Sequence, residues 1–308
     1  MPLDAEAARA SVARAGEALG LDVVDTAWGM FAIVCENMAQ AARLYLIERG
    51  QDPRRFALLG FGGAGPATAA RVAGLLGMSE VLIPPAAGLA SALGLLVAPP
   101  GFDFGQSLAG ELDELDYSEV ERVLARMEAD GREMVLTAGG RAEAVHQERR
   151  AEMRYVGQFQ DIEVPVPRPL DGAAAQDLKR RFDGAYRASY GLTLDGYAVE
   201  ALNWRVLVTG AAPSMDLRAA FAGPRGAAEP KGRRRIYLPE AREFAEVPVY
   251  DRARLGLGGG VAGPAIVEEP EATTVVWPGD RLTVDDQGNL VIRIGRAGDA
   301  AAGSEGAR

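Results

Sequence analysis

Apolar positions recur every three or four residues through the first fifty residues, which is the pattern of helices that bury one face. Asp4 is placed to cap a helix that runs to about Leu19. A longer helix follows, with Asp25 or Thr26 as its cap and Gly50 at its end. Its predicted buried stripe consists of Phe31, Val34, Cys35, Met38, Ala42, Tyr45 and Leu46.

The next segment combines short apolar runs with helical patterns. Buried strands are predicted at 56–61 and in "SEVLIPP", where two prolines end the run. Between them lie a glycine loop and a helix over 66–76, for which Pro66 suits the first helical position. "GLASALGLLVA" predicts a helix of small residues that must pack closely, and an amphipathic helix is expected over 118–138.

From Gln147 the period of the apolar positions changes to two, which predicts a hairpin of strands within 147–166. A helix over 178–190 and a long strand in "YAVEALNWRVLVTG" follow, and beyond residue 232 only short strands are expected. The sequence therefore predicts an α/β protein with a first domain over 1–105, an α+β domain over 106–210, a linker or loop over 211–232, a small all-β domain over 233–294 and a disordered tail over 295–308.

Composition and charge narrow the class of protein. With 308 residues, 48% of them hydrophobic and 25% charged, the chain has the composition of a soluble globular protein. The net charge of -10 disfavours a nucleic acid or an anionic membrane as partner, because both require a basic surface. A single cysteine, Cys35, and a single histidine, His146, exclude a disulfide framework and metal clusters rich in Cys or His. Since neither a signal peptide nor a bilayer-spanning apolar run is found, a cytoplasmic protein is expected.

The main candidate for chemistry is the glycine loop in "LLGFGGAGPATAARVAGLL", with the spacing Gly60-x-Gly62-x-x-Gly65. A Walker-type phosphate loop requires a lysine after the last glycine, where this chain has Pro66. A dinucleotide-binding loop requires an acidic residue at the end of the next strand, but that strand has Glu80 at its beginning. Neither motif is complete.

Two interpretations of the loop remain. Gly62, Gly63, Ala64 and Gly65 carry little bulk, so a flat or charged ligand can approach their backbone at the N-terminus of the next helix. In the alternative, the glycines serve only the close packing of strand on helix. Asn37, on the long helix, is a further candidate, for contact with a ribose.

Other polar residues carry weaker signals. Ser91 lacks the Gly-x-Ser-x-Gly elbow of serine hydrolases, and His146 begins a predicted strand. Glu268 and Glu269 are adjacent in a predicted strand, so their side chains face opposite ways and do not form a shared acid–base pair. The sequence assigns no catalytic residue and no metal ligand.

Several short motifs occur in a fixed order along nearly the whole chain. They are Asn37–Met38, Asp52–Arg54, Gly62–Pro66, Pro84–Pro85, Ser91–Gly94, Met153–Gln158, Tyr190–Leu192 and "GPAIVEEPEATTVVWPGDRLTVDDQGNLVI". This ordered series resembles the carboxyl-terminal part of the hydantoinase A/5-oxoprolinase family. That family includes ATP-dependent hydantoinases, 5-oxoprolinases, a caprolactam-opening enzyme and carboxylases of acetone and acetophenone.

The resemblance implies a partial actin/hexokinase-like ATPase lobe over 1–105, followed by an α+β, β-rich C-terminal domain. In that fold Gly62, Gly63 and Gly65 would approach the nucleoside of ATP rather than its phosphates. The family's phosphate segments are missing, since no Asp-x-Gly-Gly occurs in this chain. Mg or Mn would therefore be held mainly by a partner chain.

The resemblance also implies partners: an N-terminal ATPase half on a separate chain, a hydantoinase B-like subunit and a small-molecule substrate. The expected function is that of a subunit of an ATP-dependent enzyme that activates a cyclic amide by phosphorylation. The isolated chain is expected to be inactive. A subunit of an ATP-dependent ketone carboxylase and a non-catalytic scaffold that binds no nucleotide are the alternatives.

Overall fold

The structure is a computed structural model that describes residues 4–170, 174–213 and 229–295. Its contacts divide the chain into two compact units, which are described separately. Unit 1 combines residues 1–94 with 216–308, and unit 2 consists of residues 95–215. The mixed helix-and-sheet fold predicted from the sequence is confirmed.

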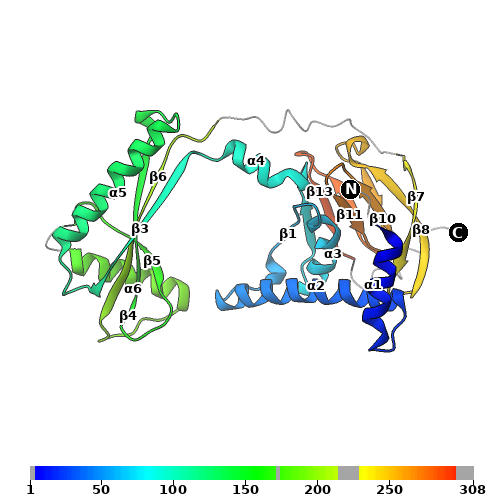
Figure 1. The fold of residues 1–308 in the computed structure, drawn as a ribbon, viewed down its shortest axis with the longest axis horizontal. Coiled ribbons are helices and arrows are strands. Elements are labelled where there is room, and N and C mark those ends of the chain that lie inside the picture. The colour runs from blue at the N-terminus through cyan, green and yellow to red at the C-terminus, as the bar shows by residue number, and fades with distance from the viewer. Residues whose placement is uncertain (1–3, 171–173, 214–228, 296–308) are drawn as a thin grey trace. The chain divides into compact units, whose positions relative to one another are not determined.

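Unit 1 begins with two helices (Figure 1). Each of them is capped by an aspartate. α1 (Ala5–Glu17) is capped by Asp4, as predicted. α2 (Val23–Glu48) begins at Asp22 rather than at Asp25 or Thr26, because the Asp22 carboxylate accepts hydrogen bonds from two backbone N–H groups of the first turn.

The glycine-rich segment gives two further helices. α3 (Gly65–Leu76) has Pro66 in its first turn and ends at Gly77, which adopts the left-handed conformation. Both features were predicted from the sequence. α4 (Ala90–Val97) contains no buried residue, so the close packing expected for this helix is not found.

Two sheets complete unit 1. The first has the order β1 (Leu58–Leu59), β2 (Glu80–Ile83), β13 (Leu290–Arg293), β12 (Arg281–Val284) and β9 (Gly260–Ala262). The second has the order β11 (Thr273–Val276), β10 (Ala265–Glu268), β8 (Glu243–Asp251) and β7 (Gly232–Leu238). β1 pairs with β2, and β10 with β8, in parallel; the remaining pairs are antiparallel.

The grouping of strands differs from the domain boundaries expected from the sequence. β13 pairs with β2, so strands within 233–294 share a sheet with the N-terminal segment instead of forming a separate domain. The expected boundary at 105/106 lies inside a strand of unit 2. Most of the expected linker over 211–232, and residues 296–308 of the expected tail, lie outside the described residues.

The core of unit 1 surrounds α3, between α2 and strands of both sheets. Cys35 is fully buried there, and burial raises the pKa of its thiol, so its predicted role as a core residue is confirmed. The predicted stripe is wrong for Val34, Met38 and Tyr45, which are exposed. α2 carries apolar residues around most of its circumference, and the side with Cys35 and Ala39 packs into the core, while α1 covers Thr26 near its start.

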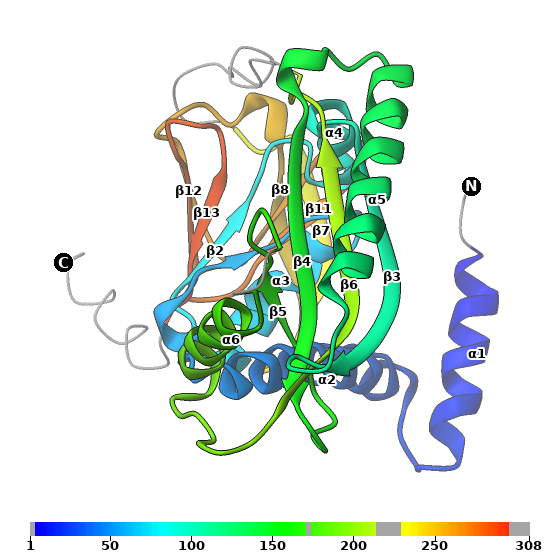
Figure 2. The ribbon, with the colours of Figure 1, turned by 90° about the vertical axis from the view of Figure 1, so that its left-hand side faces the viewer.

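Unit 2 is a four-stranded antiparallel sheet with two helices on one face. The strand order is β3 (Gly101–Glu111), β6 (Val199–Thr209), β4 (His146–Tyr155) and β5 (Ile162–Pro165), and the helices are α5 (Tyr117–Thr137) and α6 (Ala174–Tyr190). Figure 2 shows α5 lying along β3 and β6, which it contacts, while α6 contacts β5. Side chains of both helices and of alternate strand positions form a single core.

β3 was not predicted as a strand. Its three glycines and its polar residues hide the period of two, and only Phe102, Phe104 and Leu108 pack towards the core. As the edge strand of the sheet, β3 does not require a continuous apolar face. In the described parts of both units, no helix is long and apolar enough to cross a membrane.

Candidate functional site

The glycine loop connects β1 to the N-terminus of α3. Gly62 donates its backbone N–H to the carbonyl oxygen of Ala87 at 2.8 Å, and its φ of 86° lies in the left-handed region that favours glycine. Ala64 is the N-cap of α3 and has no side-chain capping bond. Since the first turn of a helix carries free N–H groups and the positive end of the helix dipole, this end of α3 is suited to a polar or anionic ligand.

The glycines of the loop differ in what surrounds them. A Cβ atom at Gly60 would lie 2.6 Å from Ile83 Cδ1 and 2.8 Å from Ala69 Cβ, so Gly60 is required by packing. A Cβ atom at Gly62 would meet nothing within 4 Å, and one at Gly65 would only meet the Gly60 carbonyl carbon at 3.9 Å. The packing interpretation therefore fits Gly60, and open space lies beside the other two.

Two further loops border the glycine loop. A Cβ atom at Gly63 would lie 3.4 Å from the carbonyl oxygen of Glu271, its nearest neighbour. Glu271 also approaches the loop that follows β2, because a Cβ atom at Gly88 would lie 2.4 Å from Glu271 Cβ. Segments that are far apart in the sequence, around residues 62, 87 and 271, thus meet at the N-terminus of α3.

Asn37 lies on an exposed part of α2. The neighbours that pack into the core from this part of α2 are Cys35 and Ala39. The contact of Asn37 with a ribose, like the approach of a ligand to Gly62, remains a prediction.

Glu268 and Glu269 face opposite ways, as predicted from their adjacent positions. Glu268 forms ion pairs with Lys231 and Arg234 at the surface, whereas the side chain of Glu269 is only 8% exposed and pairs with Arg252 at 3.2 Å. Burial raises the pKa of Glu269, and the charge of Arg252 opposes this shift. Arg252 was not recognised from the sequence, because an arginine after a strand carries no signal that it will be buried.

In the part of the chain that the structure describes, no group of three or more His, Cys, Asp or Glu side chains is placed to hold a metal ion. Buried acidic groups in these residues have other partners: Glu269 pairs with Arg252, and Asp280 accepts hydrogen bonds from backbone N–H groups of Trp277 and Gly295.

The candidate site is thus a backbone-lined loop at a helix N-terminus in a mixed α/β unit. Sequence comparison gives the family. Residues 1–103 match the hydantoinase/oxoprolinase family, and residues 113–292 match the hydantoinase/oxoprolinase C-terminal domain. The chain belongs to the hydantoinase/oxoprolinase family, which confirms the resemblance seen in its motifs.

Three relatives illustrate the range of the family. An uncharacterised protein of Methanocaldococcus jannaschii is 29% identical over 95% of this chain and 41% of its own length. The caprolactamase subunit alpha of Pseudomonas jessenii is 28% identical over 87% of this chain and 39% of its own length. The acetophenone carboxylase gamma subunit of Aromatoleum aromaticum is 28% identical over 95% of this chain and 41% of its own length. The chain spans about two fifths of the length of these relatives.

The crystal structure of the ATP-dependent caprolactamase from Pseudomonas jessenii is similar to this chain in fold. The TM-score is 0.68 with 26% sequence identity, over 94% of this chain and 42% of that one. The relatives thus include an ATP-dependent caprolactamase as well as subunits of acetophenone and acetone carboxylases.

Proposed function

We propose that this chain is a subunit of an ATP-dependent enzyme of the hydantoinase/oxoprolinase type, which activates a cyclic amide by phosphorylation. The chain supplies the lobe that contacts the nucleoside of ATP, through Gly62, Gly63, Ala64 and Gly65. The observation that carries this proposal is the open space beside Gly62 and Gly65, next to a helix N-terminus without a side-chain cap. The ATP dependence of the related caprolactamase supports the choice of ligand.

The other parts of the active site belong to partners in this proposal. Transfer of a phosphoryl group requires a metal ion and in-line positioning of the reacting groups. We assign Mg or Mn mainly to an ATPase part outside the residues of this chain, which covers only 41% and 39% of the length of two relatives. A hydantoinase B-like subunit is the second proposed partner, and the isolated chain is expected to have no ATPase activity.

The exposed side of α2 supports a role in subunit contacts. Ile33, Leu44 and Ile47 are 62%, 60% and 59% exposed, on the side of the helix away from Cys35. β1 is an edge strand, and Leu59 and the nearby Phe61 are also exposed, at 55% and 50%. Large apolar side chains exposed in such number are typical of surfaces that contact a partner.

The test of the nucleotide site compares two glycines of one loop. Gly63→Val is expected to weaken ATP binding at least tenfold, about 1.4 kcal/mol, because the branched side chain occupies the approach to the backbone. Its fold is expected to persist, since the position of the new Cβ has only one neighbour, at 3.4 Å. The measurement is calorimetric titration of ATP onto the complex that copurifies with the tagged chain.

Gly60→Ala is the matched control. Its Cβ would overlap Ile83 and Ala69, so it is expected to lower the free energy of unfolding by about 1–3 kcal/mol and to act on ATP binding only through the fold. An intact complex of the Gly63→Val variant with unchanged ATP affinity would remove the loop from the site and favour a scaffold that binds no nucleotide.

A ketone carboxylase subunit is the second candidate function. It is favoured by the acetophenone carboxylase gamma subunit, which matches 95% of this chain at an identity equal to that of the caprolactamase subunit. Product analysis of the purified complex with a lactam, and with a ketone plus bicarbonate, distinguishes the two reactions.

A further inference from the structure

A buried ion pair lies behind the glycine loop. Arg252, at the start of the 3₁₀ turn Arg252–Arg254, has a side chain that is only 10% exposed. Its guanidinium donates to the carbonyl oxygens of Ile83 and Gly288, both at 3.0 Å, and to Glu269 Oε1 at 3.2 Å. One side chain therefore ties together the end of β2, the turn between β12 and β13, and the end of β10.

Glu269 extends this connection to the loop that follows β2. The backbone N–H of Ala86 lies near the Glu269 carboxylate and lowers its pKa, against the larger effect of burial. Ala86 has φ 51° and ψ 43°, a left-handed conformation that is uncommon for a residue with a side chain and that persists only where the surroundings support it. The next residue, Ala87, offers the carbonyl oxygen that accepts the N–H of Gly62.

The contacts thus form one path from Arg252 through Glu269, Ala86 and Ala87 to Gly62. We propose that Arg252 and Glu269 are positioning residues that hold the loop Gly62–Gly65 in the shape in which its backbone receives a ligand. The identity of that ligand rests on the proposed function; the positioning of the loop does not. Gly88 also lies close to Glu271, so the loop after β2 and the loop after β10 meet at a second point.

The ion pair between Arg252 and Glu269 is consistent with a positioning role. Replacing a buried ion pair by apolar residues of similar size is often neutral or stabilising, so such a pair is weak evidence for stability as such. A guanidinium, however, has several donors in a fixed plane and can set the relative positions of several acceptors at once. Here those acceptors come from three separate segments.

The experiment measures amide hydrogen exchange by NMR in the full chain, and ATP affinity in the copurified complex. Glu269→Ala is expected to accelerate exchange of the Gly62 and Ala86 N–H groups at least tenfold while exchange in β12 and β13 stays unchanged. Glu268→Ala, the same substitution one residue earlier, is the matched control and is expected to leave both amides unaffected. Glu269→Gln keeps an acceptor for Ala86 and is expected to retain the protection of Gly62 within threefold.

The outcomes separate the two proposals. Gly62 exchange that stays within twofold of the wild type in Glu269→Ala, or that rises equally in Glu268→Ala, overturns the positioning role. Accelerated exchange with unchanged ATP affinity supports positioning and contradicts the proposed nucleotide site. If Glu269→Ala does not fold, Arg252→Lys serves in its place, because lysine keeps the charge but cannot reach three acceptors; unchanged Gly62 exchange in that variant also overturns the proposal.

Discussion

Unit 2 covers its own core, whereas unit 1 leaves apolar surface exposed along a helix. In unit 2 Trp204, Tyr155 and Phe182 are fully buried between the sheet and its two helices. The other face of that sheet carries ion pairs such as Arg154–Glu200 at 2.7 Å. Unit 2 also exposes apolar side chains, among them Phe159 at 95%, but this residue lies in a loop. In unit 1 the exposed residues recur along one side of α2.

The distribution of apolar residues around a helix indicates whether one or both of its sides are buried. α5 is amphipathic, with buried Val120, Leu124 and Met127 on one side and charged residues on the other. α2 is apolar on both sides, although α3 covers only one of them. A helix of this second kind is expected to be buried on both sides in its functional assembly.

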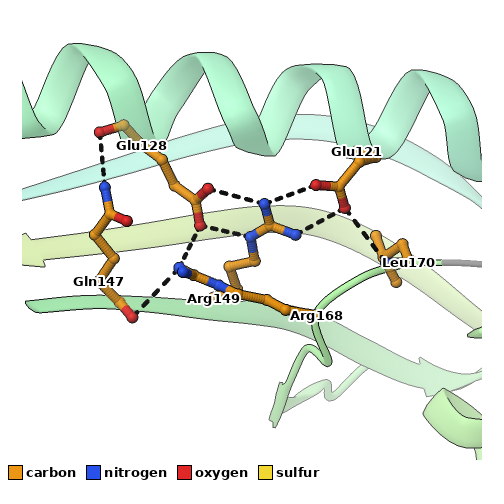
Figure 3. A network of polar contacts seen from close by, with 6 residues as sticks. All are labelled: Glu121, Glu128, Gln147, Arg149, Arg168 and Leu170. Atoms are coloured by element: carbon orange, nitrogen blue, oxygen red, sulfur yellow. Dashed lines mark hydrogen bonds and ion pairs between the residues drawn. The ribbon is translucent and has the colours of Figure 1, made fainter.

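Unit 2 contains a polar network at the edge of its core, shown in Figure 3. Arg149 donates to Glu121 and Glu128 of α5, and Arg168 also donates to Glu128. Burial by itself lowers the pKa of Arg149, but the hydrogen bonds to Glu128 and Glu121 outweigh it and raise that pKa. The hydrogen bond from Arg149 in turn lowers the pKa of Glu121. Helix α5 is thereby attached to β4 by charge as well as by apolar packing.

The largest effect on stability is expected for a substitution in the core of unit 2 that leaves unit 1 unaffected. Trp204 is fully buried, and its indole N–H donates to the carbonyl oxygen of Leu108 at 3.1 Å. Trp204→Ala is expected to lower the free energy of unfolding of unit 2 by about 3–5 kcal/mol. Amide exchange should accelerate in β4 and β6 but not in β2 and β13. Equal acceleration in all four strands would show that the units unfold together, and Trp204→Phe should give a smaller change.

An intermediate effect is expected for the polar network. Arg149→Ala leaves two partly buried glutamates without their partner and is expected to destabilise unit 2 by roughly 2 kcal/mol at pH 7. Because the folded-state pKa of Glu121 is lowered, its stabilising contribution is present above the pKa of the unfolded state and is lost as the pH falls through the folded-state value.

The difference in stability between wild type and Arg149→Ala should therefore shrink on acidification below about pH 4.3, the ordinary pKa of a glutamate. Exchange of amides in β4 and β6 at neutral and acidic pH measures this. Arg141→Ala is the control, since Arg141 and its partner Glu143 are both well exposed. A difference that grows at low pH would contradict the assigned role of Glu121.

The smallest effect on stability is expected for the exposed side of α2. Ile33→Ser combined with Leu44→Ser should change the free energy of unfolding by no more than about 0.5 kcal/mol per site, but it should reduce association with partner chains. Light scattering and copurification measure this. Phe159→Ser, at the exposed apolar residue of unit 2, is the control and should leave association intact. A larger loss of association in Phe159→Ser than in the α2 variant would contradict the assignment of the partner contact to α2.

Local chemistry made several features predictable from the sequence. Asp4 and Gly77 delimit helices because capping depends on a few consecutive residues. The open backbone at Gly62 was anticipated from residue types alone, although the packing role of Gly60 was not distinguished from it. β3 was missed because its edge position lets glycines and polar residues interrupt the apolar alternation.

The sequence by itself determined the α/β class, most of the helices, the small-residue loop at the start of α3 and, through an ordered series of motifs, the family. Only the tertiary structure decided that β13 pairs with β2, that one side of α2 remains exposed, and that Arg252 and Glu269 meet behind the loop. Capping and periodicity act between neighbours in the chain, so they can be read from it. Strand pairing joins residues about two hundred positions apart, as in β13 and β2, and Arg252 bonds to the Ile83 carbonyl oxygen 169 positions away. The energy of such contacts depends on geometry that no short stretch of sequence contains.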